Sequence, residues 1–148
     1  MVRLLFAALG FALAASPGQT PSTDTKPSVQ AFQQYEAVRV ALSGDNLKDA
    51  SARAKDLAGS SHGVGGDAAK KAAEQIGSAS TIEDARAHFG DLSAILVPIF
   101  QQEAIAGVHA FVCPMKKKTW AQKGDQLQNP YYGKAMATCG NALPSKPK

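Results

Sequence analysis

Hydrophobic residues recur every three to four positions along separate stretches of this chain. This spacing constrains the fold more than any other feature, because it is the period of an amphipathic α-helix. The first stretch begins at Ser28 and ends at Ser43-Gly44, and the second follows Asp45, a residue type that caps helices well. The periodic positions of the first are Val29, Phe32, Tyr35 or Glu36, Val38 or Arg39, and Leu42; those of the second are Leu47, Ala50, Ala54, Leu57 and Ala58.

A cluster of glycine and serine from Gly59 to Gly66 predicts a flexible connection, containing a solvated His62, to a weaker helix over Asp67 to Gly77. Ser80 and Glu83 then form a capping box before the longest periodic run, which should stay helical to about Ala106 with a bend at Pro98. The positions of this run are Ile82, Ala85, Phe89, Leu92, Ile95 or Leu96, and Ile99. Short links between such helices predict an antiparallel bundle.

The pattern changes after Gly107. Val108 to Cys113 is a short run with β-branched and aromatic residues, which predicts a strand that Pro114 ends. A polar loop around Trp120 follows, with room for a second short strand. Asn129, Pro130 and Gly140 then suit the start and end of a short terminal helix. The predicted fold class is mainly α, an antiparallel helical bundle with a short C-terminal strand and loop and a terminal short helix.

The first residues resemble a secretory signal peptide. Arg3 precedes an apolar run from Leu4 to Ala14, and small residues there predict cleavage after Ala14 or Ala15. The predicted organisation is a signal peptide over 1–15, a disordered linker over 16–27, a helical domain over 28–143 and a disordered tail over 144–148. We therefore expect an exported protein, periplasmic or secreted, with no membrane insertion after signal cleavage.

The charge of the chain is only mildly positive. Loss of Arg3 with the leader lowers the formal net charge from +4 to +3, because the first fifteen residues contain no acid. The single basic run is Lys116-Lys117-Lys118, and no aromatic residue interleaves it as single-strand binding would require. We interpret this run as a solvated loop, and we expect no nucleic-acid partner.

Sulfur side chains gather in the last third of the chain, with Cys113 and Met115 in one pair and Met136 and Cys139 in another. Thiolates and thioethers are the donors that Cu(I) prefers. Residues 113 and 115 point the same way in an extended strand, while residues 136 and 139 meet through the i, i+3 relation of a helix. If the terminal helix folds back on the strand, these sulfurs could surround one soft cation.

The competing interpretation is a disulfide. An exported protein with an even cysteine count most often forms one. A Cys113–Cys139 bridge would close a loop and stabilise the fold by about 3 kcal/mol. The methionines could equally be core residues. His88 could join a metal site if its turn faces the sulfurs, whereas His109 is first a strand residue. The chain has no Cys-x-x-Cys redox pair and no His-Glu-x-x-His helix, and we predict that the protein is not an enzyme.

The order of several motifs resembles the DUF3347 family, exported domains found alone or attached to CusB-like periplasmic adaptors of heavy-metal efflux pumps. Its C-terminal elements here are Cys113-Pro114-Met115, Trp120-Ala121-Gln122, Asn129-Pro130-Tyr131-Tyr132-Gly133, Met136 and Cys139-Gly140; upstream, Tyr35 through Asp45 and Arg86, His88, Phe89, Leu92 and Ser93 also match. Ala121 stands where a larger apolar residue is common, and we expect a free-standing binder without an adaptor barrel or hairpin before the domain.

The resemblance implies a helical domain that handles copper or a related soft metal, with Cys113, Met115 and Cys139 as ligands and Met136 and His88 as further candidates. It also implies that Trp120 and Tyr131 shield or pack the site. The expected cofactor is Cu(I) or Ag(I), and the expected partner is a periplasmic efflux adaptor or a copper chaperone. With a disulfide, there would be no metal, and the chain would be an interaction or structural domain.

Overall fold

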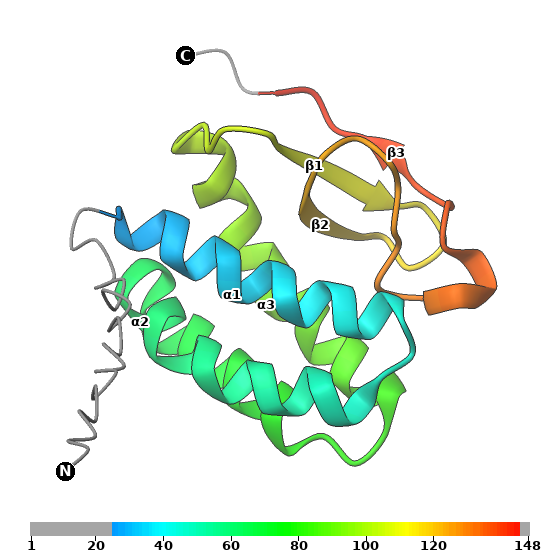
Figure 1. Cartoon of the computed structure of the whole chain (residues 1–148), viewed down its shortest axis with the longest axis horizontal. Helices are drawn as coiled ribbons and strands as arrows, with labels where there is room; N and C mark the ends of the chain where they lie inside the picture. The colour runs from blue at the N-terminus through cyan, green and yellow to red at the C-terminus, as the bar shows by residue number, and fades with distance from the viewer. Residues whose placement is uncertain (1–24, 146–148) are drawn as a thin grey trace, which may run out of the picture.

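The computed structural model describes residues 25–145, so the predicted signal peptide, most of the predicted linker and the last three residues of the predicted tail lie outside the described residues. Three helices come first along the chain, and short links between them reverse the chain direction (Figure 1). They are α1 (Pro27–Ser43), α2 (Leu47–Ser78) and α3 (Ile82–Gln102). A small antiparallel sheet follows. The three helices contain most of the described residues, which confirms the predicted mainly α fold class. Within residues 25–145, no helix is both long and apolar enough to cross a membrane.

The start of α2 differs from the sequence prediction by one residue. Asn46 is the N-cap, and its side-chain oxygen accepts a hydrogen bond from the Asp49 amide at 3.1 Å. Asp45 has a φ of 59°, in the left-handed region that asparagine and aspartate tolerate better than other non-glycine residues. Its carboxylate does not cap α2 and instead accepts hydrogen bonds from Arg86 and from the Lys134 amide.

The predicted break between Gly59 and Gly66 is wrong for most of its length. Helix α2 continues through Gly59, Gly63 and Gly65, and the backbone leaves the helical region only at Gly66, where φ is 69°. Tertiary packing outweighs the low helix propensity of glycine here. At Gly65 an added Cβ would lie 2.9 Å from Ile95 Cγ2, so the small residue lets α2 approach α3 closely.

Helix α3 also shows a shifted cap. Thr81, and not Ser80, is the N-cap, with its hydroxyl accepting from the Asp84 amide at 3.1 Å. Pro98 is inside the helix, as predicted, but the helix ends at Gln102, before the predicted end at about Ala106. The chain then reverses through Gly107, whose φ of 72° suits glycine.

The predicted strand is β1 (Val108–Cys113), and its bounds are confirmed. The second strand is β2 (Lys118–Lys123), within the predicted polar loop, and β3 (Asn141–Ala142) is a strand that the sequence analysis did not predict. The sheet order is β2-β1-β3, with both pairs antiparallel. The predicted terminal helix is wrong: only the 3₁₀ turn η1 (Gly133–Met136) forms between Asn129 and Gly140.

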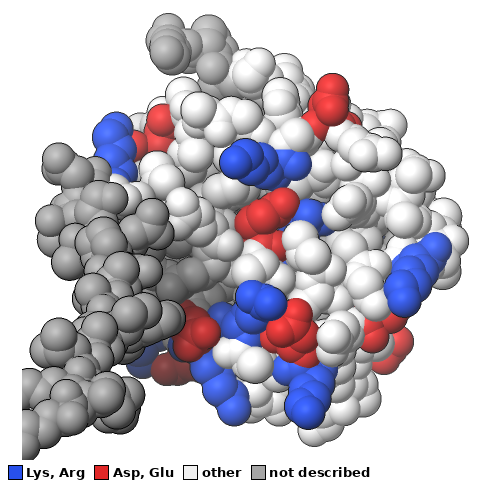
Figure 2. Space-filling model, viewed as in Figure 1, with Lys and Arg blue, Asp and Glu red and all other residues white. Residues whose placement is uncertain are grey.

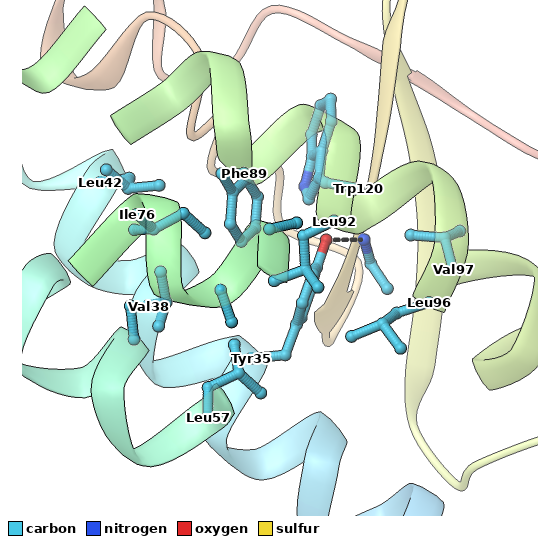
Figure 3. Packing of buried hydrophobic residues seen from close by; sticks show 14 of the residues in the cluster. Tyr35, Val38, Leu42, Leu57, Ile76, Phe89, Leu92, Leu96, Val97 and Trp120 are labelled. Carbon is cyan, nitrogen blue, oxygen red and sulfur yellow. Dashed lines mark hydrogen bonds between the residues drawn. The ribbon is translucent and has the colours of Figure 1, made fainter. Parts of the chain in front are cut away.

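The core is centred on the fully buried Tyr35 of α1. Its ring stacks on Phe89 with centroids 4.8 Å apart and meets Phe100 edge-on at 5.4 Å. Its hydroxyl shares a 2.7 Å hydrogen bond with Ser93 of α3 and accepts the Ala121 amide of β2 at 3.3 Å, which is the dashed line in Figure 3. One phenol thus joins the helices to the sheet.

A partly buried ion pair on α1 makes a second connection to the sheet. Arg39 donates to Glu36 at 2.6 and 2.9 Å and to the Gln128 carbonyl at 2.9 Å, while Glu36 accepts the Lys123 amide at 3.3 Å. The sequence periodicity left Arg39 open as an alternative to Val38, and both side chains are buried. Because the pair is hydrogen-bonded on both sides, its burial is tolerated.

Candidate metal centre

Cys113 is the last residue of β1 and is fully buried. Alternation along the strand puts its side chain on the same sheet face as Phe111, and its cross-strand partner is Lys118. Burial raises the pKa of the Tyr131 phenol. The Cys113 thiol likewise lies in a packed environment.

Cys139 is half-buried and lies two residues before β3. The Asn129 side chain fixes the backbone there: its Nδ2 donates to the Cys139 carbonyl at 2.7 Å, and its Oδ1 accepts the Tyr131 amide at 2.8 Å. The Asn129 amide also donates to the Ala137 carbonyl at 2.7 Å. Asn129, predicted as a helix cap, instead closes the loop that carries Cys139.

The strand register brings the two cysteine segments together. Val112 pairs with Asn141 across β1 and β3, so continuing the antiparallel register by one residue sets Gly140 opposite Cys113. Cys139 is the next residue along, and the red β3 segment lies beside the end of β1 in Figure 1. No disulfide joins Cys113 and Cys139 in the described part of the chain. The C-terminal segment thus returns to the Cys113 end of β1 as an extended chain, not as the predicted helix.

The two methionines differ in exposure. Met115 lies in the turn between β1 and β2 with 60% of its surface exposed, whereas Met136 is half-buried at the end of η1. The Met136 carbonyl accepts the Cys139 amide at 3.1 Å. One tight turn therefore spans residues 136 and 139, although the longer helix predicted there is absent. Met136 stays in the same short loop as Cys139, while Met115 stays adjacent to Cys113.

His88 lies on α3, and its side chain is 31% exposed. Its Nδ1 atom is buried and has no hydrogen-bond partner among the described residues; the closest carboxylate oxygen is Asp91 Oδ2 at 4.0 Å. Lys118 connects this turn of α3 to the hairpin, donating to Ala87 O at 2.9 Å and Asp91 Oδ1 at 3.0 Å. An unsatisfied buried nitrogen costs about 1–3 kcal/mol, which makes His88 the histidine most suited to gain a ligand.

The other histidines lie elsewhere. His62 is exposed on α2, with its Nδ1 3.2 Å from Asp67, and His109 is exposed on β1. Over residues 25–145, His, Cys, Asp and Glu side chains form no group of three that could hold a metal ion. A soft-metal site here would therefore depend on the two thiols, with thioethers as further donors.

The sequence analysis missed the structural role of Arg86. Its guanidinium donates to the Pro130 carbonyl at 2.8 Å, to the Leu42 carbonyl at 3.0 Å and to Asp45 Oδ1 at 2.5 Å. Gly133 packs directly against this group: with φ at 55°, an added Cβ would lie 1.9 Å from Asp45 Oδ1. We call Arg86, Asp45 and Gly133 the arginine clamp.

Asp45 completes the clamp by accepting the Lys134 amide at 3.1 Å. The hydrogen bond from Arg86, followed by the one from Lys134, lowers the pKa of the Asp45 carboxyl. The signal for the clamp was present in the sequence, since Asp45, Arg86 and Gly133 all fall within the motifs of the resemblance. Spacing alone could not reveal their contact because they come from three distant segments.

Searches of curated proteins and of solved structures found no match to the chain. A family model described as a protein of unknown function, DUF3347, matches residues 31–106. The matched range contains most of α1, all of α2 and all of α3, and ends before both cysteines. It includes Tyr35, Asp45 and Arg86, which connect the helices to the C-terminal segment. The chain belongs to the DUF3347 family.

Proposed function

We propose that this chain is an exported, non-enzymatic protein that binds Cu(I) or Ag(I) through the thiolates of Cys113 and Cys139. It would sequester the ion or deliver it to an efflux adaptor or a copper chaperone. The observation that carries the proposal is the β1–β3 register, which pairs Val112 with Asn141 and so brings together the two backbone segments that carry Cys113 and Cys139. Soft thiolate ligands select a monovalent soft ion.

The donor set favours a low coordination number. Cu(I) and Ag(I) accept two or three ligands, so two thiolates and one thioether are enough. Met136 is the better third donor because the turn that holds Cys139 also holds Met136. Met115 is largely exposed, which suits a ligand that captures or releases the ion at the surface. His88 is a further candidate through its unpartnered Nδ1.

Metal titration of the reduced protein under anaerobic conditions tests the proposal. We expect one Cu(I) per chain in competition with a chromogenic Cu(I) chelator, and loss of stoichiometric binding in Cys113→Ser and in Cys139→Ser. Met136→Leu should weaken binding by about ten-fold, a size typical of losing one supporting donor. His88→Gln tests whether His88 is a further ligand. His62→Gln is its matched control, because His62 is exposed on α2. Unchanged stoichiometry in Cys113→Ser would refute the assignment.

Acidification provides an independent check. Cysteine binds as the thiolate, so protons compete with the ion and the apparent affinity should fall as pH decreases. The same titration repeated at two pH values measures this. A pH-independent affinity would show that thiolates are not the ligands.

The same register favours one alternative from another class, a Cys113–Cys139 disulfide in a metal-free interaction or structural domain. Such a bridge encloses 25 intervening residues and would stabilise the fold by about 3 kcal/mol. Thiol counting on protein isolated without reductant separates the two. Two free thiols support the metal site, whereas no free thiol and a mass lower by two hydrogens support the disulfide.

A further inference from the structure

A pocket of about 260 Å³ lies between the first turns of α3, the β1–β2 hairpin and the loop after Pro130. Helix α3 contributes Glu83, Arg86 and Ala87 to its lining, and the hairpin contributes Lys116 and Lys118. None of the proposed metal ligands lines it. Sites for drug-sized ligands span roughly 300–1,000 Å³, so this pocket suits a small molecule.

The walls of the pocket are held in place by hydrogen bonds. Arg86 is fixed by its hydrogen bonds to the Pro130 carbonyl and the Asp45 carboxylate, and Lys118 is fixed by its hydrogen bonds to the Ala87 carbonyl and the Asp91 carboxylate. Both cations already have partners, so they shape the pocket and contribute positive potential. Little reorganisation would be needed when a ligand enters, and such preorganisation favours binding.

Lys116 differs from these two cations. Its Nζ lies 5.1 Å from the ring centroid of Tyr132, and it has no carboxylate within 4.0 Å among the described residues. Its three N–H donors are therefore available at the pocket lining. The rings of Tyr131 and Tyr132 and the methyl group of Ala87 supply the apolar part of the same lining.

We propose that this pocket binds a small organic carboxylate with a flat apolar body. The carboxylate would accept hydrogen bonds from Lys116, with Lys118 and Arg86 adding to the potential, and the apolar body would lie against the tyrosine rings. Glu83, also in the lining, opposes the anion. Removing the charge of Lys116 should therefore weaken binding of the carboxylate, whereas removing the charge of Glu83 should strengthen it.

Benzoate is the probe, titrated at low ionic strength into metal-free protein kept reduced, with binding followed by NMR chemical shifts. We expect a dissociation constant on the order of 1 mM for a ligand of this size. Neutral benzamide, which has the same ring, should bind at least ten-fold more weakly, and acetate likewise. Equal binding of benzamide overturns the role of the charge, and equal binding of acetate overturns the role of the ring.

Variants locate the site. Lys116→Met should weaken benzoate binding about ten-fold, the scale of a hydrogen bond to a charged group. Lys117→Met is the matched control: it removes the same charge from the neighbouring residue, which does not line the pocket. Glu83→Gln should strengthen binding about two-fold, while Asp84→Asn should not. No detectable benzoate binding, or equal losses at residues 116 and 117, would overturn the proposal without bearing on the metal site.

Discussion

The Arg86 guanidinium and the Asp45 carboxylate form a 2.5 Å ion pair that joins α3 to the turn between α1 and α2. The same guanidinium donates to Pro130, so the pair also fixes the C-terminal loop. Only 12% of the Arg86 side chain is exposed. An arginine with this many partners acts as a tertiary connection between three segments, unlike the exposed charged side chains on the face shown in Figure 2.

Arg86→Met should therefore destabilise the fold by about 3 kcal/mol, because it leaves two carbonyls and a carboxylate without their donor. Arg53→Met is the matched control: Arg53 pairs with Asp49 at 2.9 Å on the exposed face of α2, where such a pair contributes at most about 0.5 kcal/mol. Urea unfolding of the two variants measures the difference. Equal losses would mean that Arg86 is an ordinary surface cation.

Asp45 predicts a pH dependence. Its pKa is lowered in the folded state, so its contribution to stability is present above the unfolded value of about 3.9 and is lost as pH falls through the lower folded value. The Asp45→Asn variant should be less stable than the parent at pH 7 and should lose less stability than the parent on acidification below about pH 4. Unfolding curves at pH 7 and in this acid range check the sign, and parallel acid losses would contradict it.

Tyr35 predicts the opposite pH dependence. Burial raises the pKa of its phenol above the ordinary value of about 10, so its contribution is complete below that value and is lost as pH rises. Tyr35→Phe should cost about 1–2 kcal/mol near pH 8, through the lost bonds to Ser93 and Ala121, and should flatten the alkaline decline above about pH 10. Tyr132→Phe, which removes a hydroxyl from a half-buried ring, is the control measured in parallel.

Gly133 and Gly59 should respond to alanine in opposite directions. Gly133→Ala places a methyl group against Asp45 and Arg86 at a φ of 55°, and should destabilise by about 2 kcal/mol or more. Gly59 lies inside α2 with nothing within 4 Å of an added Cβ, so Gly59→Ala should stabilise by about 0.5–1 kcal/mol. Thermal unfolding distinguishes the signs, and a stabilising Gly133→Ala would show that the clamp does not need this close approach.

Helix positions were predictable where apolar residues recur every three to four positions along the sequence. All four predicted helical stretches of the bundle are helical in the structure, with the second and third joined within α2, and the strand over Val108–Cys113 is present. Helix ends were less predictable: Asn46 and Thr81 cap the helices, although neighbouring residues of similar type were equally plausible. A cap depends on which side chain reaches the free amide, and sequence type cannot decide between adjacent candidates.

The stretch from Gly59 to Gly65 shows where local preference was overruled. Its glycines weaken an isolated helix, yet packing of α2 on α3 keeps it helical, and only Gly66 departs. The C-terminal segment shows the reverse case. Asn129, Pro130 and Gly140 have the preferences of helix ends, but Asn129 bonds across the loop to Cys139 and the segment joins the sheet as β3.

The sequence by itself determined the helical period, the first strand and the inventory of sulfur side chains, because these depend only on neighbouring residues. The tertiary structure alone decided that Cys139 returns beside the end of β1, that Arg86 meets Asp45 and Gly133, and that Lys116 is left without a carboxylate partner in the described chain. These are contacts between segments separated by many residues. They depend on the register and packing of the whole fold, which local periodicity does not encode.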